Sequence, residues 1–514
     1  MARRYGLTLS GALRWILALS ALAYLLLFLY LALRRLGYPY ELEWMEGGTV
    51  DHVRRILSGQ RLYVEPSIEF TPFIYTPLYF YTAALLAKVF GVSFFALRLV
   101  SFLSSIGCFV IIFQFVRRET RSLLCATVSA CLYAATYRLT GTWFDLARVD
   151  SLFMFFLLGS VYVLRFKQGS AWLAVAGIFI SLSFLTKQAA LLAAVPLSVY
   201  CLVGLRGWSR VVYPGAVALV VGLTTIVFDS LSDDWYRYYV FELPRQHAIV
   251  REMIVGFWMN DLAKPLPVAL GVSVFYLIGL RRREKRGDLL FFIFLLAGMV
   301  GASWFSRLHS GGYRNVVLPA YAVIAICFGL GIRGFVKEAA GASSDPGGAA
   351  AAPHDTPTGL AFEPYRQLVL VLCVFQFVAL FYNPQAQLPS KADLIAGRFF
   401  VQKLEKIEGE VFVPYHGFLP ALAGKRTYAH GMAIEDVLRG SDGEVKDKLR
   451  ENIADAIRSK RFAAIILDRP WFIEEIEQAY VLTRRLFRDR RVFYPVTGRS
   501  TRPNMVYELA EAGT

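Results

Sequence analysis

The sequence predicts a polytopic α-helical membrane protein that ends in a small extracytoplasmic α/β domain. Hydrophobic residues make up 56% of the chain, charged residues only 18%, and the mean hydropathy is +0.47, whereas about a quarter of the residues of a soluble protein are charged. Apolar runs long enough to cross a roughly 30 Å hydrocarbon core recur along the first 382 residues. Arg and Lys gather in short runs between them, which is typical of cytoplasmic loops.

The net charge and the cysteines narrow the class further. A net charge of +16 would suit a nucleic-acid-binding protein, but the basic residues lie between apolar helices, so we expect no nucleic-acid partner. All six cysteines fall inside apolar segments, which predicts no disulfide framework. No signal-peptide cleavage site follows the first apolar run, so we expect that run to remain as a membrane anchor.

The alternation of apolar runs and charges predicts about eleven membrane spans. Arg3, Arg4 and Arg14 place the N-terminus in the cytoplasm. The predicted spans are residues 15–33, 96–116, 123–140, a span ending at Lys167, 171–185, a span ending at Arg206, 211–228, a span ending at Arg281, 289–305, 316–332 and 367–381. We therefore expect a multi-pass protein of the bacterial inner membrane, with a cytoplasmic N-terminus and an extracytoplasmic C-terminal domain.

The first outer loop, residues 34–95, contains an apolar helix that is too short to span. Pro77 suits the first turn of a helix and Gly91 suits the position just after its end. The residues between them reach only roughly 21 Å at 1.5 Å per residue. The pattern predicts a juxtamembrane helix in the outer leaflet.

Four regions follow from this plan. We expect a transmembrane catalytic domain over residues 1–333, a flexible cytoplasmic linker over 334–364, the last transmembrane helix over 365–382 and an α/β domain over 383–514. The linker is rich in Gly, Ala, Pro and Ser. In the last region, strand-like runs begin at Val411, Phe462 and Met505, and a helical pattern covers residues 446–459.

The acidic stretch after the first span is the strongest functional signal. Glu41, Glu43 and Glu46 lie within six residues of one another, close to the membrane boundary. Ionisable groups are costly there and usually mark a site, although a single Glu in this position would more often be a solvated loop residue.

Other polar residues near the predicted outer ends of the spans form a candidate substrate-binding set. These residues are Glu41, Asp145, Arg148, Asp150, Lys187, Gln188, His309 and Arg314. Cations bind phosphate, and a carboxylate can act as general base on an incoming hydroxyl. This combination suits an anionic, lipid-linked, polar substrate and indicates glycosyl transfer from a polyprenyl-phosphate sugar.

Simpler interpretations remain open for individual residues. Asp145, Arg148 and Asp150 would also suit a structural ion network. A lone Lys such as Lys187 often extends its ammonium group to the membrane interface, and His309 lies in a Gly-rich loop where it is more often structural.

The order of these features resembles the bacterial GT-C glycosyltransferases, the superfamily of the dolichyl-phosphate-mannose protein mannosyltransferases and the aminoarabinose lipid A transferases. The similarity rests on the acidic stretch, on Gly59 and Tyr63, on the segment PLYFYTAALLAKVFG and on ALRLVS. It implies an outer-face cavity, a polyprenyl-phosphate sugar donor and inversion at the anomeric carbon. It aligns Glu46 with the second acid of the family's motif.

The chain departs from that family's pattern at several positions. The first acid is Met45, the Arg two positions after the Glu is Gly48, and the Lys before the paired prolines matches Tyr75. The resemblance therefore leaves Glu46 or Glu43 as the base, with Glu46 preferred. It also leaves Arg148 and Lys187 to replace the family's usual cations and to approach one phosphate together.

The main prediction is an integral membrane glycosyltransferase that acts on a lipid, glycan or protein acceptor in contact with membrane lipid. The alternatives are a lipid-linked oligosaccharide polymerase or ligase and a transporter or flippase, although no internal repeat supports a transporter. The sequence identifies no cofactor. A divalent cation stays an open alternative, and its ligands are unknown.

Overall fold

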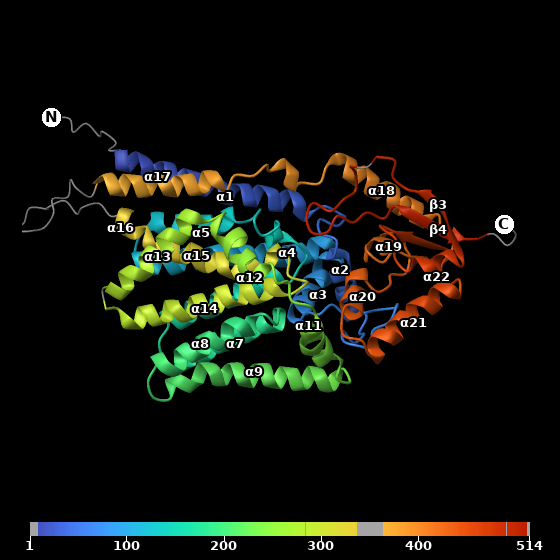
Figure 1. The fold of residues 1–514 in the computed structure, drawn as a ribbon, viewed down its shortest axis with the longest axis horizontal. Helices are drawn as coiled ribbons and strands as arrows, with labels where there is room; N and C mark the ends of the chain where they lie inside the picture. The colour runs from blue at the N-terminus through green and yellow to red at the C-terminus, as the bar shows by residue number, and fades with distance from the viewer. Residues whose placement is uncertain (1–8, 283, 337–362, 490, 511–514) are drawn as a thin grey trace, which may run out of the picture.

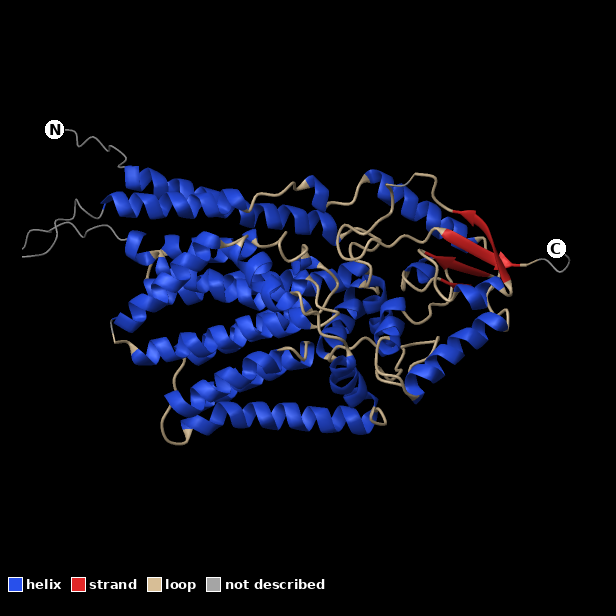
Figure 2. Ribbon diagram, in the orientation of Figure 1, coloured by secondary structure: helices blue, strands red, loops and turns tan. Residues whose placement is uncertain are grey.

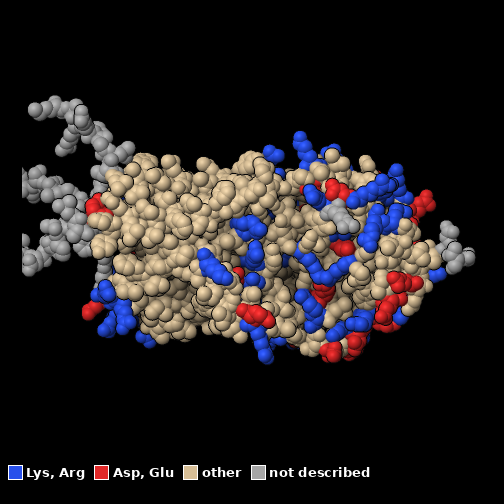
Figure 3. Space-filling view, turned by 45° about the horizontal axis from the view of Figure 1, so that its top comes forward, with Lys and Arg blue, Asp and Glu red and all other residues tan. Residues whose placement is uncertain are grey.

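The computed structural model describes residues 9–282, 284–336, 363–489 and 491–510. A bundle of long helices forms one part of the molecule, and a mixed helix and strand region lies at one end of it (Figures 1 and 2). Most of the predicted linker, and both Arg3 and Arg4, lie outside the described residues. The surface over much of the bundle is uncharged, and acidic and basic side chains are mixed at the other end (Figure 3).

Each predicted span coincides with a helix. These helices are α1 (Leu9–Leu36), α4 (Phe94–Thr120), α5 (Leu123–Ala135), α6 (Asp150–Phe166), α7 (Ser170–Thr186), α8 (Ala190–Gly204), α9 (Ser209–Leu231), α13 (Pro267–Arg282), α14 (Arg286–Leu308), α15 (Leu318–Gly331) and α17 (Glu363–Ala379). The short elements between them are η1 (Trp143–Asp145), α10 (Trp235–Arg237), η2 (Tyr238–Glu242), α11 (Leu243–Gln246), α12 (Met253–Gly256), η3 (Phe257–Ala263), η4 (Arg314–Val317) and α16 (Arg333–Val336).

The count of eleven spans is not confirmed. Within the described residues, five helical segments are long and apolar enough to cross a membrane, or six if the pair 253–263 and 267–282, bent by 95°, is one span. The others are shorter. For example, α5 ends at Ala135 rather than at Thr140, because the chain turns there and passes through left-handed backbone at Gly141 and Thr142.

The segment between α1 and α4, predicted as the first outer loop, folds into two helices, α2 (Glu46–Leu57) and α3 (Leu78–Phe90). As predicted, α3 follows Pro77 and ends at Gly91, whose φ of 80° favours glycine. Tyr79 lies on its buried face, whereas Leu85 lies on an exposed apolar face. The position of α3 in the outer leaflet stays a prediction.

The C-terminal region contains a four-stranded sheet in the order β1-β2-β4-β3, with β1 (Val411–Phe412), β2 (Ala464–Leu467), β3 (Tyr480–Arg485) and β4 (Met505–Leu509). β1 and β2 are parallel, with Val411 opposite Ala464, and the other pairs are antiparallel. The helices around the sheet are η5 (Gln385–Gln387), α18 (Lys391–Glu405), α19 (Leu419–Leu422), α20 (Gly431–Leu438), α21 (Glu444–Arg458) and α22 (Ile473–Glu477). Strands occur at all three predicted runs, and β3 was not predicted.

Two large apolar cores hold the molecule together. One lies inside the helical bundle. The other joins the first outer loop to the C-terminal sheet and contains, among others, Trp44, Val50, Phe412 and Ile465. Because the loop and the sheet share this core, the acidic stretch is packed directly against the C-terminal region.

Candidate active site

Glu46 begins α2 and lies fully buried against Arg98 of α4. The Arg98 guanidinium donates Nε to Glu46 Oε1 at 2.9 Å and Nη2 to Oε2 at 2.6 Å. The amide of Ala147 also donates to Oε1 at 2.7 Å, and the amide of Leu42 donates to Oε2 at 2.7 Å. Burial alone would raise the pKa of Glu46, but the Arg98 charge and these donors lower it below its ordinary value.

Arg98 ties the same region to the end of α1. Its remaining N–H groups donate to the carbonyls of Arg35, Tyr38 and Tyr40. The Glu46–Arg98 pair therefore bonds the backbone at the end of α1, in residues 38–43 and at Ala147, and both oxygens of the Glu46 carboxylate are already occupied.

Glu43 lies two residues after Glu41 and is also fully buried, but it is less completely bonded. Its Oε2 accepts from Arg148 Nη1 at 3.1 Å and from the Met45 amide at 3.2 Å. Its Oε1 has no hydrogen-bond partner among the described residues. Burial raises the pKa of Glu43 to about 8, against the opposing effect of Arg148.

Arg148 links Glu43 to Tyr75. Its Nη2 donates to the Tyr75 hydroxyl at 2.9 Å, and its guanidinium lies over the rings of Tyr75 and Trp143. Burial raises the pKa of Tyr75, and the charges of Arg148 and Lys187 both lower it. Both cations therefore act on the same buried hydroxyl.

A strap from the C-terminal region, residues 493–499, covers the acidic stretch. The Thr497 amide donates to Leu42 O at 3.1 Å, and the Thr497 hydroxyl donates to Gly141 O at 2.6 Å. Gly498 lies against the Glu43 side chain. The strap therefore lies between Glu43 and solvent.

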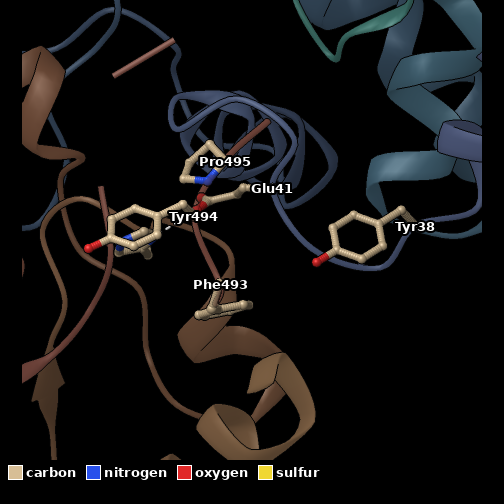
Figure 4. A pocket seen from close by; sticks show the side chains of 6 residues that line it. Tyr38, Glu41, Phe493, Tyr494 and Pro495 are labelled. Carbon is tan, nitrogen blue, oxygen red and sulfur yellow. Dashed lines mark hydrogen bonds and ion pairs between the residues drawn. The ribbon is translucent and has the colours of Figure 1, made fainter. Parts of the chain in front are cut away.

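Glu41 forms a second link to the C-terminal region. Its Oε2 lies 2.5 Å from His416 Nδ1, and His416 Nε2 lies 3.1 Å from Asp468 Oδ2. Burial raises the pKa of Glu41 to about 7, and each ring nitrogen of His416 faces one carboxylate. Burial would lower the pKa of His416, but Asp468 and Glu41 raise it to about 10. Figure 4 shows Glu41 next to Tyr494 and Pro495, and these residues line a small pocket together with Tyr38 and Phe493.

Asp150 begins α6 and pairs with Lys187 from the end of α7. Lys187 Nζ lies 2.6 Å from Asp150 Oδ1, and the same oxygen accepts from Asn315 Nδ2 at 2.8 Å. Asp150 Oδ2 has no partner among the described residues. Gln188 donates to Ile74 O at 2.6 Å, just before Tyr75. The structure thus brings Arg148, Asp150, Lys187 and Gln188 to one place.

Three of the predicted substrate-binding residues lie outside this cluster or in a structural position. Asp145 accepts from Tyr137 and pairs with Arg35 at 3.1 Å, so it supports the ion-network interpretation. His309 donates to Pro244 O at 3.0 Å and is part of a different loop contact. Arg314 is exposed and has no ion pair within the described ranges, and it precedes Asn315.

Comparisons with known proteins identify the architecture. Residues 74–228 match the profile of the dolichyl-phosphate-mannose-protein mannosyltransferase family, and no curated protein shows a significant sequence match. The fold matches the crystal structure of ArnT from Cupriavidus metallidurans in the apo state, with a TM-score of 0.58 at 12% identity over 95% of this chain and 97% of that one. A structure of ArnT bound to undecaprenyl phosphate gives a TM-score of 0.56 at 12% identity, over 95% and 98% of the two chains. A third match is the archaeal oligosaccharyltransferase AglB from Archaeoglobus fulgidus, in complex with an inhibitory peptide and a dolichol-phosphate. Its TM-score is 0.51 at 11% identity, over 86% of this chain and 69% of that one.

This chain has the GT-C type fold of membrane glycosyltransferases. Its departure from the family pattern at Gly48 has a steric reason in the structure. A Cβ on Gly48 would lie 2.6 Å from the Phe73 ring and 3.0 Å from the His430 ring. The C-terminal region approaches so closely that a long side chain does not fit there.

The sequence did not identify several residues that complete this candidate site. Arg98 lies within the quoted segment ALRLVS, and a single Arg in an apolar helix is itself a signal of a buried partner. His416, Asp468 and Asn315 carry no local signal, because their partners lie far away in the sequence. Among the described residues, no three His, Cys, Asp or Glu side chains are placed to hold a metal ion.

Proposed function

We propose that the chain transfers a glycosyl group from a polyprenyl-phosphate sugar to an acceptor hydroxyl, with inversion at the anomeric carbon and Glu43 as the general base. The observation that carries this proposal is the Glu43 carboxylate, which has one unpartnered oxygen beside Arg148. Its fold matches a structure that is bound to undecaprenyl phosphate, which supports a donor of the same chemical class.

Glu43 suits the role of base better than Glu46. A general base needs a free lone pair and a pKa near the operating pH. Glu46 uses both oxygens to accept from Arg98 and two amides, and its pKa is lowered. Glu43 has a free oxygen and a pKa of about 8. We therefore assign a structural role to Glu46, which stabilises the acidic stretch, and the proton transfer to Glu43.

In the reaction, the acceptor oxygen attacks the anomeric carbon while its proton passes to Glu43. The bond from the anomeric carbon to the phosphate oxygen breaks, and the electron pair leaves with the polyprenyl phosphate. Attack opposite to the leaving group inverts the configuration. Since the phosphate leaves already charged, a base and nearby cations suffice.

Lys187 and Arg314 are the cations that we propose for the phosphate. Arg148 has both terminal nitrogens committed, one to Glu43 and one to Tyr75. Lys187 has one ion-pair partner, Asp150, so its ammonium keeps further donors. Arg314 is adjacent to Asn315, which bonds the same Asp150 oxygen.

Glu43 is fully buried, so the acceptor must displace a covering segment. The strap is the segment in contact with its side chain. We therefore propose that binding of an acceptor moves the strap away from Glu43.

We also propose the predicted topology, with the acidic stretch and the C-terminal region on the outer side of a bacterial inner membrane. A cysteine placed at Ser441 is then labelled by an impermeant thiol reagent in intact cells, and one at Ser343 is shielded. Reversed labelling would contradict the orientation.

The likeness to AglB supports one alternative, the transfer of an oligosaccharide from a lipid-linked donor. The two functions separate in one assay. The purified chain is incubated with a polyprenyl-phosphate monosaccharide or a lipid-linked oligosaccharide, together with mixed lipid, glycan and peptide acceptors. We expect acceptor-dependent release of polyprenyl phosphate from the monosaccharide donor. No release from either donor would contradict both functions, and transport of an intact donor without release would favour a flippase.

A further inference from the structure

We propose that the end of the bundle opposite the acidic stretch contains a binding site for the headgroup of an anionic phospholipid. The site is a cavity of about 320 Å³ lined by Thr120, Arg121, Ser122, Cys125, Arg333 and Val336. Residues 333–336 form α16, which lies at the far end of the molecule from the C-terminal sheet (Figure 1). The inference is independent of the proposed catalytic reaction.

Two guanidinium groups dominate the lining. Arg333 donates Nη1 to the Glu119 carbonyl at 3.1 Å, and Arg121 lies just after the end of α4 in the left-handed region, with φ of 55°. Neither guanidinium has an ion pair with a carboxylate in the part of the chain that the structure describes. The cavity therefore carries uncompensated positive charge.

Two acidic side chains, those of Glu119 and Asp288, are already committed to another cation. The Glu119 carboxylate lies 2.6 Å from Arg165 Nε, and Asp288 lies 2.8 Å from Arg165 Nη2. Because Arg165 takes both carboxylates, they do not neutralise Arg121 or Arg333. An anion from outside the chain would satisfy the two free cations.

The remaining lining is neutral and includes two hydroxyl groups. Ser122 caps α5 by accepting from the Cys125 amide at 3.3 Å, and the Thr120 hydroxyl accepts from the Ser122 amide at 3.1 Å. α5 starts at Leu123, so its positive N-terminal dipole also favours an anion here. Two arginine side chains next to hydroxyl groups suit the binding of a phosphate.

A lipid headgroup is the source of phosphate that best fits this position. The cavity lies at the ends of α4 and α5, and the adjoining surface of α5 carries the exposed apolar side chain of Leu123. Basic pockets between transmembrane helices near a membrane surface bind anionic lipid headgroups. A soluble phosphate would make no use of that apolar neighbour.

The test uses the full chain in nanodiscs of phosphatidylcholine, with phosphatidylglycerol as the added lipid. Native mass spectrometry counts the retained phosphatidylglycerol, and a thermal melt measures its effect on the Tm. We expect one tightly retained molecule for the wild-type chain. Arg121→Gln and Arg333→Gln each weaken retention by about fivefold, since a basic residue near the membrane surface is worth about 1 kcal/mol.

Arg206→Gln is the matched control, because Arg206 is an exposed cation after α8 and does not line the cavity. It should retain the lipid as the wild-type chain does. Arg333→Lys should retain more than Arg333→Gln, which separates lost charge from misfolding. Equal retention by Arg206→Gln and the Arg121→Gln/Arg333→Gln double variant would overturn the proposal. Equal stabilisation by inorganic phosphate at matched concentration would overturn the assignment to a lipid.

Discussion

Gly498 lies in van der Waals contact with the carboxylate arm of Glu43, and a Cβ at Gly498 would lie 2.9 Å from both Cγ and Oε1 of Glu43. The C-terminal strap therefore meets the proposed base at its unpartnered oxygen. Gly498 also has a φ of 81°, which favours glycine. Both the backbone conformation and the lack of space therefore disfavour a side chain at this position.

Gly498→Ala is expected to lower turnover by about 100-fold, because displacement of a catalytic group by about 1 Å costs that much. Gly424→Ala is the matched control, since Gly424 also has a positive φ, 66°, but open space around it. Both variants should lose stability through the strained backbone, Gly498→Ala more so because its Cβ also meets Glu43, and only Gly498→Ala should lose activity. Equal turnover in the two variants would contradict a role for this contact.

Glu43→Gln is expected to lower turnover by about 100-fold or more, because general base catalysis usually contributes a rate enhancement of this size. The variant keeps the shape of the side chain but leaves Arg148 buried without its ion-pair partner, so the Tm should also fall, and turnover is compared per folded protein. Glu444→Gln, on the exposed face of α21, serves as the control for removing one carboxylate. Full activity in Glu43→Gln would exclude Glu43 as the base.

Glu46→Gln is expected to destabilise the folded chain by about 3 kcal/mol or more, because it leaves Arg98 buried without its counter-ion. The free energy of unfolding in detergent measures this effect. An unchanged stability combined with lost turnover would return the role of base to Glu46.

The turnover number is expected to rise with pH through about 8. Burial raises the pKa of Glu43 to about 8, and a base acts in its deprotonated form, so activity is low below this pH and reaches a plateau above it. Profiles of kcat between pH 6 and 9.5 would show the rising limb, and the limb should be lost in Glu43→Gln. A wild-type profile that is flat across this range would contradict the assignment.

Lys187→Gln and Arg314→Gln are each expected to raise the KM for the polyprenyl-phosphate donor by about tenfold, since a charge-assisted hydrogen bond contributes about 1.5–3 kcal/mol. Lys264→Gln is the matched control, because Lys264 is an exposed cation whose ammonium group donates to Asn260. A rise in the KM of the acceptor alone would show that these cations contact a different substrate.

The helices and the acidic stretch could be predicted because their signals are local. Apolar runs predicted the positions of the bundle helices, and Pro77 and Gly91 predicted both ends of α3. β3 was missed because five of its six residues are exposed, so no alternation of apolar and polar residues marks it.

The partners of the acidic residues could not be predicted from local patterns. Glu46 aligned with the family's motif, but its neutralisation by Arg98 depends on how α2 packs on α4. His416 lies 375 residues after Glu41. The choice between Glu43 and Glu46 rests on which carboxylate oxygen stays unpartnered, and that is decided by tertiary contacts.

The core shared by the first outer loop and the C-terminal sheet sets an order of events during synthesis. Trp44 and Val50 leave the ribosome hundreds of residues before Phe412 and Ile465, against which they pack. Until those later residues arrive, the acidic stretch has no His416, no Thr497 and no cover. The nascent protein therefore cannot complete the candidate site while it is being inserted, and the site forms only when the last segment has docked.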